Sequence, residues 1–359
     1  MPAMTPKEIF LRTLRLEPTP RHPVALLSGG IWTLNRQGLS LEQALVAGAQ
    51  RSAGIIVETT GLLRSDLVWT GSGYHNLAIR ALGGRIKFRP RGAPDVLEPL
   101  LKTAADAETL DLDRLDEDPD LVLLRDTTRL VAGAVGGHLM VGSSAWGPFT
   151  YAGLLYGVER LMRNIYKNKE EVHAVLGFAA ELSFRYLAGF VAAGAGLVSV
   201  ADPTASGDLI SRRQFEEFVL PYQTRVIGRL KAMGAEALVH ICGETTDRLD
   251  LVARSGAGVV SVDYKVNLAR AAAILEGKLA LAGNMNPVAV MQASSPEEVA
   301  RACRACILEA GPGSSHLLMP GCDIPPTVPL DNIRAMVDTA WQHVWPGEAR
   351  PAFASPGDH

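Results

Sequence analysis

The sequence predicts an α/β protein whose strands and helices alternate to form a (β/α)8 barrel. Eight short apolar or β-branched runs recur along the chain, each bounded by Gly, Ser, Asn, Asp or Pro and each followed by a segment with helical periodicity. Because these runs are continuously apolar, they indicate parallel strands that are buried on both faces. A chain of 359 residues, 47% of them apolar, is long enough for one such barrel. An open, doubly wound sheet is the alternative.

The first expected element is a helix that precedes the barrel. Thr5 and Glu8 have the spacing of a capping box, and Pro6 occupies the first helical position between them. We expect this helix to act as a lid or plug for the core. The eight expected strands are, in order, Val24–Leu27, Gly54–Val57, His138–Gly142, Leu197–Val200, Ala237–Ile241, Val259–Val262, Leu279–Ala282 and His316–Met319.

An irregular segment, from Arg85 to Val135, separates the second and third expected strands. It holds an acidic run, from Asp106 to Asp120, and a helix that begins near Leu121. We interpret the segment as an insertion and its acidic run as a solvated surface or a face for a partner protein. Residues 1–347 are expected to form a single barrel domain, and residues 348–359 a flexible tail.

Composition excludes several kinds of partner. A net charge of −3 gives no strong electrostatic footprint, so nucleic acid is not an expected ligand. No apolar run reaches membrane length, and the N-terminal stretch lacks the apolar core of a signal peptide, so we expect a cytoplasmic protein without a membrane partner. The four cysteines give no disulfide framework and leave thiolates free to bind metal. The oligomeric state is left open.

Three side chains at the ends of two expected strands form a candidate zinc site. His240 and Cys242 lie two residues apart on a strand and so project from the same face, and Cys322 follows the last strand. Imidazole and thiolate are the ligands that zinc prefers, and a catalytic zinc typically keeps three protein ligands and one open position. In a (β/α)8 barrel the ends of all the strands meet at one mouth, where catalytic groups lie.

Other polar and aromatic residues also follow the expected strands. Asp202, Asp263 and Glu244 are candidate catalytic groups, although Asp202 also fits ordinary turn chemistry. Asp263 and Glu244 could each serve as a fourth ligand, an acceptor for a ligand histidine or a helix cap. The candidate substrate-binding residues, which would give a partly aromatic pocket, are Trp32, Trp69, Trp146 and Asn284.

The remaining cysteines are expected to be structural. Cys303 and Cys306 have the spacing of a redox motif, but they lie in a helical pattern from Glu297 to Ala310, where residues three apart merely share a face. Four histidines have no partner at a telling spacing and are interpreted as structural or exposed: His75, His138, His173 and His343.

Three motifs, taken together, resemble the uroporphyrinogen decarboxylase superfamily over nearly the whole chain. They are the stretch from Ala201 to Ser211, the sequence His240-Ile241-Cys242-Gly243, and Gly321-Cys322-Asp323-Ile324-Pro325. The last two are similar to the zinc signature of the corrinoid-linked methyltransferases in that superfamily. The decarboxylase branch carries substrate-binding arginines after the first strand, whereas Ser28 to Trp32 of this chain contains none.

The resemblance implies that zinc at His240, Cys242 and Cys322 supports methyl transfer between a small molecule and the cobalt of a corrinoid (cobalamin) held by a partner protein. Zinc would act on the oxygen of a methyl ether or the sulfur of a thiol. The three tryptophans favour a methyl-ether donor, as in O-demethylation. Coenzyme M, for which Arg36 and Arg64 are candidate cations, and tetrahydrofolate are alternative acceptors. A decarboxylase-like lyase and a non-catalytic zinc-binding scaffold are further alternatives.

Overall fold

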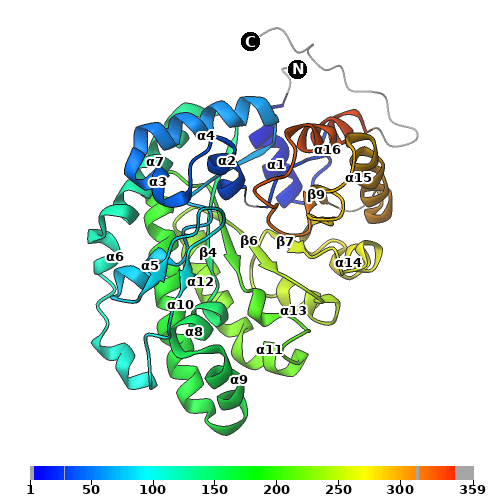
Figure 1. Ribbon diagram of the computed structural model, residues 1–359. Helices are drawn as coiled ribbons and strands as arrows, with labels where there is room; N and C mark the ends of the chain where they lie inside the picture. Colours follow the sequence, from blue (N-terminus) through cyan, green and yellow to red (C-terminus); the bar gives the residue numbers. More distant parts are fainter. Residues whose placement is uncertain (1–3, 28, 313–314, 344–359) are drawn as a thin grey trace.

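The computed structural model describes residues 4–27, 29–312 and 315–343, which form a curled parallel sheet with helices packed around it (Figure 1). Seven strands follow one another in the order β1-β4-β5-β6-β7-β8-β9, and every neighbouring pair is parallel. Their bounds are Leu67–Thr70 (β1), Met140–Trp146 (β4), Leu197–Ala201 (β5), Glu236–Ile241 (β6), Val259–Val262 (β7), Ala280–Met285 (β8) and His316–Pro320 (β9).

The segment around Val24 and Ala25, which lies between α1 (Pro6–Leu14) and the next helix, closes the sheet. Val24 pairs in parallel with Leu318 of β9, and the Ala25 amide donates to the Leu318 carbonyl at 3.0 Å. On the other side the Val24 carbonyl accepts from the Asp66 amide, just before β1, at 2.9 Å. This segment therefore lies between β9 and β1 as the eighth strand, and the expected (β/α)8 barrel is confirmed.

One expected strand is wrong. Gly54–Val57 lies inside the helix α4 (Ala49–Leu63), and the second strand of the barrel is β1. The apolar run Ile55-Ile56-Val57 is too short to distinguish a strand from a buried turn of helix. The helical period becomes clear only over the longer stretch, because the buried residues of α4 are Ser52, Ala53, Ile55, Ile56, Thr59 and Leu63. Trp69 consequently lies within a strand rather than after one.

The expected insertion ends earlier than the sequence indicated. Between β1 and β4 the chain forms α5 (Leu77–Ala81), an antiparallel hairpin of β2 (Ile86–Lys87) and β3 (Asp95–Val96), η1 (Ala104–Thr109) and α6 (Arg114–Glu117). The following helix, α7 (Pro119–Val135), packs against α4, β1 and β4, so it belongs to the helical layer of the barrel. The acidic residues of this segment form ion pairs within the chain: Asp118 and Asp120 with Arg80, Asp116 with Arg125, and Asp113 with Arg185.

The first helix closes the N-terminal end of the barrel. The expected capping box of α1 (Pro6–Leu14) is present, and the fully buried Phe10 belongs to the cluster of side chains inside the barrel. The other helices are α2 (Gly30–Arg36), α3 (Leu41–Ala47), α8 (Pro148–Tyr156), α9 (Val158–Lys167), α10 (Lys169–Ala192), η2 (Pro203–Ala205), α11 (Arg212–Phe218), α12 (Leu220–Ala232), η3 (Thr246–Arg248), α13 (Leu249–Ala253), α14 (Leu268–Leu275), α15 (Pro296–Ala310) and α16 (Leu330–Gln342).

Alternate residues of each strand face the inside of the barrel. Leu197 of β5 and Leu238 of β6 belong to the interior cluster, and the same faces carry Ala201 and His240 nearer the C-terminal ends of the strands. The register places Trp146 of β4 beside Ala201, and Ala201 beside His240. His240 and Trp146 therefore lie at the C-terminal end of the barrel, which is called the mouth below.

Among the described residues, α10 is the one helix that is long and apolar enough to cross a membrane. Half of its most apolar stretch is buried within the protein, and it packs against α8 and α12 in the helical layer. These contacts are typical of a core helix of a barrel. The expected tail, 348–359, and the residues just before it lie outside the described residues.

Candidate metal centre at the barrel mouth

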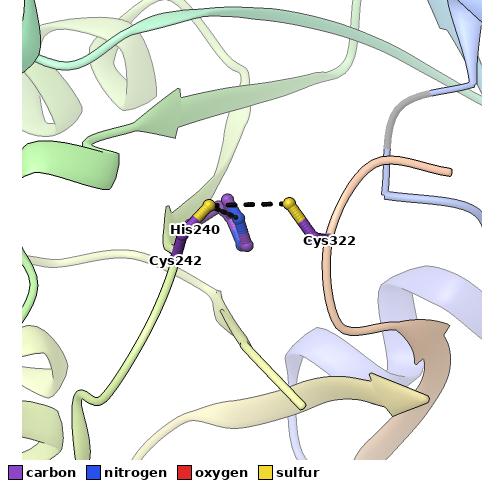
Figure 2. Close-up of side chains that lie close together, drawn as sticks. All are labelled: His240, Cys242 and Cys322. Carbon is purple, nitrogen blue, oxygen red and sulfur yellow. Dashed lines mark hydrogen bonds between the residues drawn. The ribbon is translucent and has the colours of Figure 1, made fainter. Parts of the chain in front are cut away.

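His240, Cys242 and Cys322 converge at the mouth from opposite sides of the barrel (Figure 2). His240 lies on β6, Cys242 directly follows that strand, and Cys322 follows β9. The His240 Nε2 atom lies 3.2 Å from the Cys242 sulfur, and the two sulfurs lie 3.5 Å apart. All three ligand atoms are within 4.8 Å of one another. Two segments that are far apart in sequence thus bring together one nitrogen and two sulfurs.

These separations fit a shared zinc ion. With zinc–sulfur bonds of about 2.3 Å and a zinc–nitrogen bond of about 2.0 Å, tetrahedral geometry puts the donor atoms about 3.5–3.8 Å apart. A small adjustment of the cluster satisfies that range. His240 is 5% exposed, whereas both cysteines are only partly buried, so the sulfurs can be reached from the mouth. The donor set and its exposure therefore fit a zinc ion with one open coordination position.

The ring of His240 is held by a second hydrogen bond. Its Nδ1 atom lies 3.1 Å from the hydroxyl of Ser261, which projects from the neighbouring strand β7. Such a bond at one ring nitrogen orients the other toward a metal. The sequence analysis did not single out Ser261, because the pairing of β6 with β7 cannot be read from residue types alone.

The two thiols perturb each other in opposite directions. The hydrogen bond that Cys242 donates lowers the pKa of the Cys322 thiol, and the nearby His240 lowers it further. The same bond, together with burial, raises the pKa of Cys242. The lowered pKa of Cys322 favours the thiolate form that binds a metal, and a cation held by both sulfurs would release the proton of Cys242.

Both loops that carry the cysteines require glycine next to the ligand. A Cβ atom on Gly243, whose φ is +78°, would clash with a carboxylate oxygen of Asp208. A Cβ atom on Gly321 would lie 2.5 Å from the backbone nitrogen of Tyr264. Gly243, which follows Cys242, and Gly321, which precedes Cys322, are thus packed closely against the segments that follow β5 and β7. This packing limits where the two sulfurs can move.

Asp263 fixes the loop of Cys242 through its backbone. The carboxylate is 5% exposed and accepts hydrogen bonds from the amides of Gly243 and Lys265, each at 3.0 Å. The metal-binding cluster found among the described residues contains His240 and the two cysteines but no carboxylate. In this arrangement Asp263 positions a ligand loop; it neither completes the donor set nor accepts from the imidazole of His240.

Asp202 and Glu244 also bond to neighbouring loops. Asp202 is fully buried and accepts from the Thr150 amide and the Gln223 side chain, both at 2.8 Å. The Glu244 carboxylate accepts from the Thr246 amide at 2.7 Å. Both carboxylates therefore hold the loops of the mouth in the described structure, and the catalytic roles expected from the sequence stay predictions.

We expect Asp202→Asn to change how stability depends on pH. Burial raises the pKa of Asp202 to about 6, above the value of about 3.9 for an unfolded chain. The folded state therefore holds this proton more tightly, and the contribution of Asp202 to the free energy of unfolding falls as the pH rises through 6. Urea unfolding should show the variant gaining roughly 2 kcal/mol on the parent between about pH 4.5 and about pH 7.5.

The amide of such a variant fits the site. It can accept from Thr150, while Gln223, whose Oε1 atom has no partner among the described residues, can rotate to accept from it. Parallel pH profiles of parent and variant would contradict the raised pKa of Asp202.

The expected substrate-binding residues do not all reach the mouth. Trp32 is 1% exposed and donates its ring N–H to the Val328 carbonyl, within the core around α16. Trp69 lies in the barrel interior, donates to the Leu26 carbonyl, and lines two small cavities beside α2 and α4 with room for roughly one or two water molecules. Trp146, at the end of β4, is partly exposed.

Asn284, the fourth of these residues, bonds to backbone. Its side-chain amide donates to the carbonyls of Asp263 and Val266, at 3.0 and 2.7 Å. It therefore supports the segment after β7 that carries Asp263. The two candidate cations are also engaged elsewhere, because Arg36 lies over the Trp32 ring while Arg64 pairs with Asp338.

Replacing both Cys303 and Cys306 with Ala is expected to leave the zinc content unchanged. Both lie on α15, as the sequence indicated, and Cys303 is fully buried with its sulfur 2.8 Å from that of Met285. Burial raises the pKa of both thiols, so neither is a ready metal ligand. Metal analysis checks the result, with a loss of about 1 kcal/mol in the free energy of unfolding expected from the emptied space. A large fall in zinc would contradict it.

A parallel barrel that gathers an imidazole and two thiols at its mouth has the layout of a metalloenzyme. The family model for uroporphyrinogen decarboxylase (URO-D) matches residues 5–343, so the chain belongs to this family. The resemblance seen in the sequence is thereby confirmed.

The relatives include two kinds of enzyme. Methylcobamide:CoM methyltransferase MtbA of Methanosarcina acetivorans is 29% identical over 350 residues, which cover 95% of this chain and 98% of that protein. A uroporphyrinogen decarboxylase of Syntrophotalea carbinolica is 32% identical over 270 residues, covering 73% of this chain and 75% of that protein. Among solved structures, a methyltransferase from Methanosarcina mazei superposes with a TM-score of 0.84 at 23% identity, covering 94% of this chain and 98% of that one, and shares the fold.

Proposed function

We propose that this protein is a zinc-dependent methyltransferase that moves a methyl group between a small molecule and the cobalt of a corrinoid held by a partner protein. The observation that carries the proposal is the cluster of His240, Cys242 and Cys322, with donor atoms 3.2 and 3.5 Å apart at the mouth. Similarity over almost the full length to a protein named methylcobamide:CoM methyltransferase supports it.

The residues of the chain divide the work between holding the metal and shaping its surroundings. When bound, zinc supplies a Lewis acid that activates a sulfur or oxygen atom of the substrate. Ser261 orients the imidazole of His240, and Asp263 holds the loop of Cys242. The partly buried sulfurs leave the metal accessible from the side on which a large partner can approach.

The direction of transfer depends on the substrate that the mouth accepts. The prediction of a methyl-ether donor rested on three tryptophans. Two of them, Trp32 and Trp69, are buried in hydrophobic core clusters. Trp146 alone of the three is partly exposed at the mouth. We therefore rank a thiol acceptor ahead of a methyl-ether donor, and the names of two relatives, MtbA and methylated-thiol–coenzyme M methyltransferase, support this order.

Decarboxylation is the second candidate, because relatives of that name are up to 32% identical to this chain. The residues that follow the first barrel segment argue against it. Gly29 to Trp32 contains no arginine, and Gly30 packs so closely on Ser72 that an added Cβ atom would lie 2.7 Å from its carbonyl oxygen. Ser28 lies outside the described residues. The described residues of this segment thus offer no cation to a polyanionic tetrapyrrole.

The test follows the cobalt spectrum in both directions. Zinc-loaded protein is mixed with methylcobalamin and either a thiol or tetrahydrofolate, and separately with Co(I) cobalamin and methoxylated aromatics. We expect demethylation of methylcobalamin by a thiol, and no reaction by Cys322→Ala. Silence in both directions, together with release of carbon dioxide from uroporphyrinogen, would contradict the proposal. Full zinc occupancy without any turnover would favour the non-catalytic scaffold.

A further inference from the structure

The aromatic rings of Trp146 and His75, called the wall below, lie near the end of β4, two strands from His240 of the metal cluster. Trp146 is paired in register with Ala201, and Ala201 with His240, so the three side chains share the inner face of the barrel. With neighbouring strands about 4.8 Å apart, the backbones at Trp146 and His240 are about 10 Å apart. Ala201 is 8% exposed, belongs to no core cluster and contributes only a methyl group between them. The space above Ala201, between Trp146 and His240, is therefore not filled by a large side chain of β5.

His75, which the sequence analysis treated as structural, is part of this wall. Its ring lies edge-on to Trp146, with centroids 4.7 Å apart, and its Nε2 atom is 2.6 Å from the Ser144 hydroxyl. Ser144 is two residues before Trp146 and faces the same way. The described residues offer no hydrogen-bond partner to the other ring nitrogen of His75, Nδ1. One polar atom of the wall is thus left for a ligand.

The wall is rigid and uncharged. The Tyr151 hydroxyl donates to the His75 carbonyl at 2.9 Å, and the Trp146 ring donates to the Asn76 side chain at 2.8 Å. Burial lowers the pKa of His75 to about 4, so the imidazole is neutral near pH 7. A neutral imidazole carries its proton on one ring nitrogen, so Nδ1 either donates or accepts, according to the role that Nε2 takes toward the Ser144 hydroxyl.

The charged groups around the cluster do not favour an anionic substrate. The Lys265 ammonium group is paired with Asp208 at 3.1 Å, and the Asp263 carboxylate lies beside the loop of Cys242. A sulfonate placed against His75 would meet an uncharged imidazole. Burying a charge without an opposite charge is costly, whereas an uncharged oxygen needs only one hydrogen bond.

From this geometry we infer that His75 determines specificity by forming a hydrogen bond through Nδ1 with an uncharged hydroxyl group of a short thiol substrate whose sulfur the metal holds. The inference rests on the proposed function and names the class of its substrate. Ala201 provides the space between the two ends of that substrate. His75 touches the substrate away from the reacting sulfur, so it affects binding of one substituent rather than the activation of the thiol.

The test measures binding to protein in which Co²⁺ replaces zinc, because thiol binding changes the absorption of a cobalt–thiolate site independently of turnover. The ligands are 2-mercaptoethanol, 3-mercaptopropanol, ethanethiol and 2-mercaptoethanesulfonate. The better of the two hydroxythiols should bind about five- to tenfold more tightly than ethanethiol and the sulfonate, as one neutral hydrogen bond allows. His75→Phe should abolish this preference without weakening ethanethiol, and His75→Gln should restore part of it.

Two further variants separate specificity from general damage. Ala201→Leu should weaken all four thiols while the metal content stays unchanged, and His138→Phe, an exposed site just before β4, should change nothing. Tighter binding of the sulfonate, or an equal loss for every thiol in His75→Phe, would overturn the inference. Failure of the purified protein to bind Co²⁺ or zinc would instead overturn the proposed function, and this inference with it.

Discussion

Cys322→Ala is expected to lose most of the zinc that the parent protein retains through purification. The variant keeps only His240 and Cys242, which lie on one side of the mouth. Four-ligand structural zinc sites gain about 10–16 kcal/mol, or roughly 2.5–4 kcal/mol per ligand, so affinity should fall by roughly two to three orders of magnitude. Because the cysteines are only partly buried and the barrel core does not include them, the fold should persist. Metal analysis and circular dichroism together measure both outcomes.

Cys306→Ala is the matched control, since that thiol is also partly buried but lies on α15 outside the cluster. It should keep its zinc. Methyl transfer should fall with zinc content in the Cys322 variant and remain in the control. A Cys242→Ala, Cys322→Ala double variant that still binds a stoichiometric amount of zinc would show that these cysteines are not the ligands.

The sequence was sufficient to predict the barrel and the convergence of His240, Cys242 and Cys322 because both depend on short-range patterns. Continuous apolar runs identify seven of the eight strand positions, and the spacing of His240 and Cys242 puts both on one strand face. Cys322 follows the last strand, and the closure of the sheet brings it to the same mouth. The run Gly54–Val57 failed because an apolar stretch of that length also fits one turn of α4.

The surroundings of the metal could not be derived in this way because they depend on register and loop geometry. Ser261 is one of many serines until β7 is paired with β6 in the observed register. The sequence left three roles open for Asp263: a fourth ligand, an acceptor for a ligand histidine or a helix cap. Its hydrogen bonds to the amides of Gly243 and Lys265 became visible only in the structure. His75 had no partner in sequence, because Ser144 lies 69 residues further along the chain.

Asp263→Ala is expected to affect both folding and the metal. The carboxylate is nearly buried and accepts two backbone hydrogen bonds, so its loss leaves the amides of Gly243 and Lys265 without acceptors. We expect the free energy of unfolding to fall by about 2–4 kcal/mol. Zinc affinity should fall by about 10- to 100-fold, as for other groups that hold a metal ligand in place. Urea unfolding and competition with a chelator measure the two effects.

Comparison of Asp263→Asn with Asp208→Asn separates a loop anchor from a nearby charge. The Asp263→Asn variant would keep one acceptor oxygen and should show a smaller loss of zinc affinity than Asp263→Ala, because one of the two amides stays bonded. Asp208 also lies against Gly243, but its side chain is 46% exposed and pairs with Lys265, so its amide variant should keep zinc affinity near that of the parent. Equal losses in both amide variants would mean that negative charge near the cluster, rather than the bonded loop of Cys242, sets the affinity for the metal.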